Sequence, residues 1–129
     1  MIQTGADGKP EIVRAVSTYR VNPDSGVDDD KMLDINGALI VDYVRKDLRA
    51  AALTQRRMKN TDANRRNLRS LFLSRAIKFE QAEILQNVKA RADELTVVED
   101  AIDRYRVNAR IPSDWVRGMH VIATTLDVY

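Results

Sequence analysis

Hydrophobic and polar residues alternate over residues 13–21, and this alternation predicts a β-strand. The next residues, 22–26, are Asn, Pro, Asp, Ser and Gly, which favour a turn. Asp28, Asp29 and Asp30 then precede a long segment with helical periodicity. We expect one of them to cap a helix, because a carboxylate accepts free N–H groups there and is favoured by the helix dipole.

Apolar residues recur at helical spacing in two later segments, which predicts two long amphipathic helices. The first helix is expected to run to about residue 57 and carries Leu33, Ile40, Val44, Leu48 and Ala51. The second carries Leu68, Leu71, Phe72, Phe79 and Ala82 on one face. The polar link "KNTDAN" joins them, and Thr61 or Asp62 is expected to cap the second helix.

Alternating residues predict three further strands, at 95–98, 105–111 and 119–129, with Pro112 ending the second of these. The fold class is therefore α+β: a single domain with a small mixed sheet packed against two long amphipathic helices. Residues 1–10 are rich in Gly, Asp and Pro and predict a flexible N-terminal lead or arm, which leaves residues 11–129 as the domain.

The predicted last strand, within a terminal arm at about 118–129, is apolar on both faces. Met119, Val121 and Ala123 point to one side, and Ile122, Leu126 and Val128 point to the other. Such a strand is either central in its own sheet or completed by another chain through β-augmentation. These six residues are therefore candidates for pairing with a neighbouring subunit.

Composition narrows the function classes. The 129 residues suit one domain, and the net charge of +2 argues against a protein that mainly grips nucleic acid. The absence of cysteine excludes disulfides and thiolate chemistry. The start "MIQTGADGKP" has no secretion signal and no apolar membrane segment, so we expect a product made or assembled in the cytoplasm.

Residues suited to catalysis or metal binding are few. His120 is the only histidine, and it would bind a metal only beside carboxylates such as Asp114 and Asp127. The three aspartates at 28–30 lack the alternating spacing of a calcium loop. No phosphate loop, nucleophile motif or acid and base pair is present in the sequence, so we expect neither an enzyme nor a cofactor.

Basic residues gather where the two helices meet. The cluster consists of Arg56, Arg57 and Lys59 at the end of the first helix and Arg65, Arg66 and Arg69 at the start of the second. A helix N-terminus disfavours cations, so the second group suggests an acidic surface outside the chain, either a protein or a phosphate backbone. The alternative is a solvated tip without a partner.

The order of these segments resembles the C-terminal domain of contractile phage tail sheath proteins. The resemblance runs from about residue 11 to 128 and rests on "IVRAVSTYRVN", "DDDKMLDI", "DYVRKDLR" and "VNARIPSDWVRGMHVIATTLDV". In this family an arginine-containing strand and an acidic turn precede a short "LDI" entry to a helix. A late proline then precedes the closing apolar strand, as Pro112 does here.

The resemblance implies a structural subunit of the virion tail, assembled in the host cytoplasm. Sheath subunits stack as rings around an inner tube and contract to drive it through the host envelope during genome ejection. Extended arms of these proteins add strands to the sheets of adjacent subunits. The implied partners are further copies in a ring or helical polymer, the tail tube protein and another sheath chain or domain. No small-molecule substrate or membrane is implied.

On this interpretation the basic cluster is a candidate contact with an acidic tube surface, an inference from charge rather than from a family motif. Sheath proteins of this kind normally carry an N-terminal arm and outer domains before this region. The chain is then a fragment, a minimal or split sheath, or a sheath initiator or terminator. The alternative from another class is a small DNA-binding or tail adaptor protein that uses the basic helical hairpin.

Overall fold

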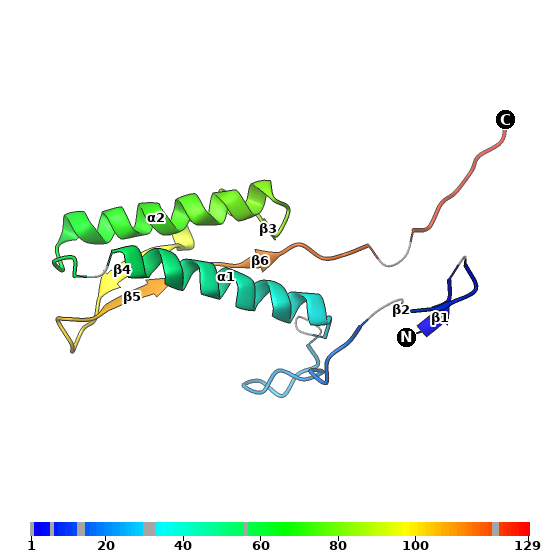
Figure 1. The fold of residues 1–129 in the computed structure, drawn as a ribbon, viewed down its shortest axis with the longest axis horizontal. Helices are drawn as coiled ribbons and strands as arrows, with labels where there is room; N and C mark the ends of the chain where they lie inside the picture. Colours follow the sequence, from blue (N-terminus) through cyan, green and yellow to red (C-terminus); the bar gives the residue numbers. More distant parts are fainter. Residues whose placement is uncertain (1, 6, 13–14, 30–32, 56, 120–121) are drawn as a thin grey trace. The chain divides into compact units, whose positions relative to one another are not determined.

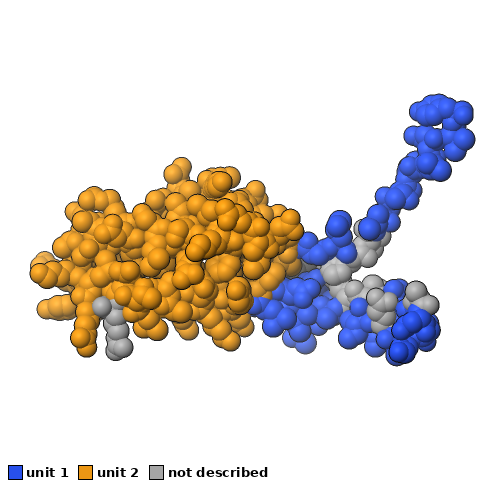
Figure 2. All heavy atoms as spheres, turned by 45° about the horizontal axis from the view of Figure 1, so that its top comes forward, with its two compact units in different colours: residues 1–39, 117–129 blue, residues 40–116 orange. Residues whose placement is uncertain are grey.

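The computed structural model describes residues 2–5, 7–12, 15–29, 33–55, 57–119 and 122–129. The chain divides into two compact units, coloured separately in Figure 2. The larger unit comprises residues 40–116, and the smaller comprises residues 1–39 together with 117–129. We call them the helical unit and the terminal unit, and describe each by itself.

Two helices dominate the helical unit (Figure 1): α1, Ile35–Thr54, whose first turn belongs to the terminal unit, and α2, Asp62–Gln81. Thr61 caps α2 as predicted, because its hydroxyl accepts a hydrogen bond from the N–H of Asn64 at 3.3 Å. Helix α1 ends three residues before the predicted limit at 57.

The prediction that an aspartate at 28–30 caps α1 was wrong. Asp34 takes this role, since its Oδ1 accepts a hydrogen bond from the N–H of Asn36 at 3.0 Å. Asp28 instead forms a β-bridge with Val21, and the Asp29 N–H donates to the Arg20 carbonyl at 2.9 Å. This pairing keeps the chain extended past the turn at 22–26 and delays the helix. Asp30 lies outside the described residues.

The strands of the helical unit form two antiparallel pairs. β3, Leu85–Gln86, pairs with β6, Asp114–Trp115, and β4, Thr96–Glu99, pairs with β5, Val107–Arg110. A short 3₁₀ helix, Ala92–Glu94, precedes β4. The predicted strands at 95–98 and 105–111 are confirmed as β4 and β5, and the α+β class is confirmed. The predicted single mixed sheet was wrong, because the sheets in the described residues are antiparallel and two-stranded.

A single apolar core holds the helical unit together. Leu85 and Leu95 are only 2% exposed, and burial of such side chains stabilises a fold by about 1.5–3 kcal/mol each. Leu71 is only half-buried and Ala82 is an exposed C-cap, so the predicted apolar face of α2 is narrower than expected. The buried core cluster contains Val44, Leu48, Phe72, Ala76, Phe79, Leu85, Val88, Leu95 and Trp115.

The terminal unit begins with a β-hairpin where the sequence predicted a flexible lead. β1, Ile2–Thr4, pairs with β2, Pro10–Ile12, and the Gly5 N–H donates to the Lys9 carbonyl at 2.8 Å. The strand predicted at 13–21 was wrong over residues 15–21, which form only two isolated bridges, Val16 with Asp34 and Val21 with Asp28. Val13 and Arg14 lie outside the described residues.

The strand predicted at 119–129 is not formed within this chain over the described residues. Residues 122–129 have neither helix nor strand, and Figure 1 draws them as an extended segment at the C-terminus. The possibility that this strand is central in a sheet of its own chain is therefore wrong for these residues. His120 and Val121 lie outside the described residues.

Candidate functional site

The structure separates the five described residues of the basic cluster into two groups. Arg65 turns toward its own chain and is only 16% exposed: its Nη1 donates to Asn60 Oδ1 at 2.6 Å and lies 3.5 Å from Glu99 Oε2, and its Nη2 pairs with Asp62. Asp62 and Glu99 therefore supply, within the chain, the negative charge that was predicted to lie on an external partner.

Arg69 also serves the fold. Its Nε donates to the Leu95 carbonyl at 2.9 Å, and its Nη2 donates to the Ala92 carbonyl at 2.8 Å. These bonds join the middle of α2 to the segment that leads into β4. Arg57, Lys59 and Arg66 are exposed, and Arg56 lies outside the described residues. Contact with a tube remains a prediction, for which Arg57, Lys59 and Arg66 are the accessible members.

Arg69→Met is expected to lower the free energy of unfolding by about 1.5–3 kcal/mol, because it removes two charge-assisted hydrogen bonds to backbone carbonyls. Urea unfolding followed by circular dichroism measures the change. Arg66→Met, at an exposed position three residues earlier on the same helix, is the matched control and should stay within about 0.5 kcal/mol. Equal effects of the two substitutions would contradict the structural role of Arg69.

The loop between β4 and β5 is organised around Asp100. Its Oδ1 accepts hydrogen bonds from the N–H groups of Ile102 at 2.9 Å and Asp103 at 3.0 Å, and its Oδ2 accepts one from Asn108 Nδ2 at 2.9 Å. These bonds lower the pKa of Asp100 to about 2, the backbone bond from Asp103 contributing most. The sequence signal for this turn is Asp100 followed by "AID", and it was not among the features predicted from the sequence.

An apolar groove of about 380 Å³ runs along α1 in the helical unit. Ile40, Val44 and Leu48 form its wall on α1, and Ala109 and Ile111 line it from β5 and the residues just after. β5 pairs with β4 on one edge, and no other described strand pairs with its second edge. The groove is therefore lined by apolar side chains of α1 and by β5, a strand that pairs on one edge only among the described strands.

The apolar side chains of the C-terminal segment are exposed to solvent and are not buried by other described residues. Met119 is 88% exposed, Leu126 87% and Val128 86%. Ile122 and Tyr129 are exposed as well, and so is Ala123. Pairing of this segment with a neighbouring subunit through β-augmentation remains a prediction.

Of the candidate metal ligands, Asp114 lies in the helical unit and Asp127 in the terminal unit. Asp114 accepts hydrogen bonds from Gln86 Nε2 at 3.2 Å and from Asn87 Nδ2 at 2.9 Å, which is a structural role between β3 and β6. Asp127 is exposed, and His120 is outside the described residues. Among the residues that the structure describes, no cluster of three potential ligands is suited to a metal ion.

Comparison with protein families gives a match to the model of the phage tail sheath C-terminal domain over residues 27–129. The chain belongs to this family. The resemblance predicted from sequence is thereby confirmed, although the match begins at residue 27 rather than at 11. It includes the groove, the basic residues and the C-terminal segment.

Membership of the tail sheath family gives the chain a structural role and places it in the virion tail. Comparisons with curated proteins and with solved structures gave no match. Neither helix in the described part of the tail sheath domain is long and apolar enough to cross a membrane.

Proposed function

We propose that this chain is a structural subunit of a contractile phage tail sheath. It polymerises around the tail tube, after assembly in the host cytoplasm, and its contraction drives the tube through the host envelope during genome ejection. Its partners are further copies of the chain or another sheath chain, and the tail tube protein. Family membership over residues 27–129 supports the sheath role.

The observation that carries the proposal is the exposed apolar C-terminal segment. A side chain such as Leu126 contributes about 1.5–3 kcal/mol when it is fully buried, and here it is 87% exposed. A polymer recovers this free energy at every subunit contact. We therefore propose that residues 118–129 are donated as a strand to a neighbouring copy.

The acceptor in this proposal is the open edge of β5 beside the groove. α1 contacts the groove from Ile40 to Ala52, which spans about 18 Å at the rise of an α-helix. An extended chain covers that length with about six residues. The apolar part of the donated segment, from Ile122 to Val128, has seven residues, so its length suits the acceptor.

The outward-facing cations suit the second partner. Arg57, Lys59 and Arg66 are exposed at the end of the helical unit where α1 joins α2. Positive charge on such a surface favours and steers contact with an acidic protein surface. We propose that these residues, rather than Arg65 or Arg69, face the tube.

The chain has no cysteine, which permits a direct test of donor and acceptor. Leu126→Cys and Ala52→Cys place one thiol each on the donated segment and on the groove. Mixing the two reduced variants and then adding an oxidant should give a disulfide-linked dimer of about twice the chain mass on a non-reducing gel. Leu126→Cys mixed with Ser70→Cys, an exposed position on α2, is the control. Equal cross-linking in both mixtures would contradict the proposed acceptor.

A further inference from the structure

Two large apolar side chains stand exposed at the tip of the β4–β5 hairpin. Ile102 is 94% exposed and Tyr105 is 98% exposed, within a loop of seven residues, 100–106. Single exposed apolar residues are ordinary, but here two lie at the same turn, away from the core. Neither belongs to the groove or to the C-terminal segment.

The loop that presents these side chains is held in place. The Asp100 carboxylate accepts hydrogen bonds from the backbone of the loop and from Asn108, as described above, and Arg106 Nε lies 3.8 Å from Asp100 Oδ2. A loop with so many internal bonds loses little conformational entropy when it binds. The backbone that carries the two apolar side chains is therefore preorganised for contact.

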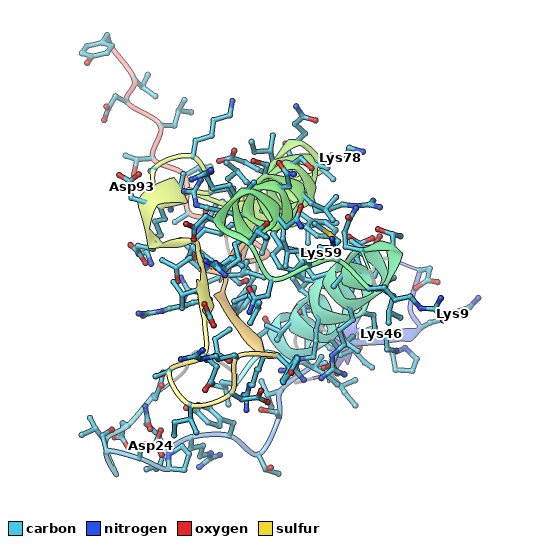
Figure 3. The ribbon with its side chains drawn as sticks, turned by 90° about the vertical axis from the view of Figure 1, so that its left-hand side faces the viewer. Lys9, Asp24, Lys46, Lys59, Lys78 and Asp93 are labelled. Atoms are coloured by element: carbon cyan, nitrogen blue, oxygen red, sulfur yellow. The ribbon has the colours of Figure 1, made fainter. Side chains whose placement is uncertain are left out.

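A second set of bonds joins this loop to the connection between α1 and α2. Asn60 Nδ2 donates to the Arg104 carbonyl at 2.8 Å, and Arg65 holds both Asn60 and Glu99 of β4. Tyr105 also lines a shallow pocket of about 170 Å³ together with Met58 and Lys59. Figure 3 looks onto this end of the helical unit, with Lys59 labelled.

We propose that these two loops form one docking surface, with Ile102 and Tyr105 as apolar anchors among the exposed cations Arg57, Lys59 and Arg104. The partner that fits is an acidic protein surface with an apolar recess. The proposal rests on the proposed function, in which this partner is the tail tube. The inference adds the β4–β5 loop to the proposed tube contact, which until this point included only basic residues at the ends of α1 and α2.

The composition of the surface favours a protein partner over nucleic acid. Ile102 cannot stack on a base as an aromatic side chain does. The exposed carboxylates of Asp62 and Asp103 stand among the cations, so the surface carries charges of both signs. An apolar anchor surrounded by charges of both signs is the usual composition of a protein interface with a polar rim.

Arg65 and Asn60 are positioning residues in this proposal, because they touch the two loops rather than the partner. Arg65→Met removes the bonds to Asn60 and Glu99 and should weaken binding through disorder of the hairpin loop. Amide exchange of Ile102 and Asp103, measured by NMR, should then rise. A merely electrostatic role of Arg65 would weaken binding without changing that exchange.

The test is binding of the full chain to purified tail tubes of the phage that encodes it, measured by co-sedimentation. The variant Ile102→Ser with Tyr105→Ser is expected to bind at least about tenfold more weakly, as for anchors at other interfaces. Val98→Thr, a half-exposed change on the same hairpin but outside its loop, is the control and should bind as the unmodified chain does. The loss of tube binding in this double variant should persist at high salt, because salt does not screen apolar contacts. The loss in Arg57→Ser with Lys59→Ser should shrink at high salt, because salt screens charges.

The outcomes separate this inference from the proposed function. Equal tube binding by the double variant and the unmodified chain would overturn the inference alone. Failure of the unmodified chain to bind tubes would overturn the tube contact and the inference with it. If the double variant binds tubes normally but no longer binds double-stranded DNA, the surface is a phosphate-binding site, and this result would also overturn the inference. Self-association without tubes, followed by light scattering, should be equal in both chains.

Discussion

Leu126→Asp is expected to weaken self-association by about 100-fold or more. In the proposed polymer this side chain enters an apolar groove, and burial of a charge without a partner costs several kcal/mol. Leu126 is 87% exposed in the single chain, so the substitution should leave the folding of that chain unchanged. Sedimentation velocity over a range of protein concentrations measures the association.

Thr125→Asp is the matched control, since it adds the same charge one position earlier on the opposite face of the extended segment. It should reduce association much less. If both substitutions have the same effect, general repulsion between C-terminal segments explains the result better than burial of Leu126. If neither has an effect, the segment takes no part in association.

Phe79→Ala is expected to lower the free energy of unfolding by about 3–5 kcal/mol, the usual cost of removing a large aromatic side chain from a core. Phe79 is 6% exposed, and its ring meets that of Tyr43 edge to face with centroids 5.8 Å apart. It therefore links α2 to α1 directly. A domain of this size has roughly 5–15 kcal/mol in total, so the variant should be partly unfolded at physiological temperature.

Leu53→Ala is the control for this substitution, because Leu53 is 64% exposed on α1 and alanine is a good helix former. Thermal unfolding followed by circular dichroism should give a stability within about 0.5 kcal/mol of the unmodified chain. A Phe79→Ala chain as stable as the Leu53→Ala chain would show that the two helices do not share the core described here.

The two helices and strands β4 and β5 were predictable because their signals are local. Apolar residues such as Val44 and Leu48, or Phe72 and Phe79, recur at helical spacing and do become core residues. The same reasoning placed the start of α1 too early, at the acidic run. The competing pairing of Val21 with Asp28 depends on a turn and on contacts that no local pattern shows.

The binding partners of the basic cluster could not be predicted from the charge pattern of the sequence. Arginines at the start of α2 suggested an external partner, but the partners of Arg65 include Glu99 of β4, more than thirty residues away in sequence. Arg69 bonds to carbonyls, which carry no sequence signal at all. Only the fold separates these two from the outward-facing Arg57, Lys59 and Arg66.

For the C-terminal segment, by contrast, the sequence pattern indicated a partner outside the chain. Its two apolar faces indicated that something must cover it, and the described residues of this chain do not form the strand that the pattern predicts. Strand formation depends on a partner edge as well as on the alternation of side chains. The sequence could therefore indicate the donor that we propose, whereas the acceptor that we propose, β5 and its groove, required the structure.

The most direct test of the central claim is electron microscopy of tail tubes incubated with the full chain and with a chain that ends at Ala123. The shorter chain lacks Leu126 and Val128 but keeps both helices and the groove. The account predicts rings or sleeves around tubes with the full chain, and none with the shorter chain, whose helical circular dichroism stays unchanged. Sleeves formed equally well by both chains would contradict strand donation by the C-terminal segment.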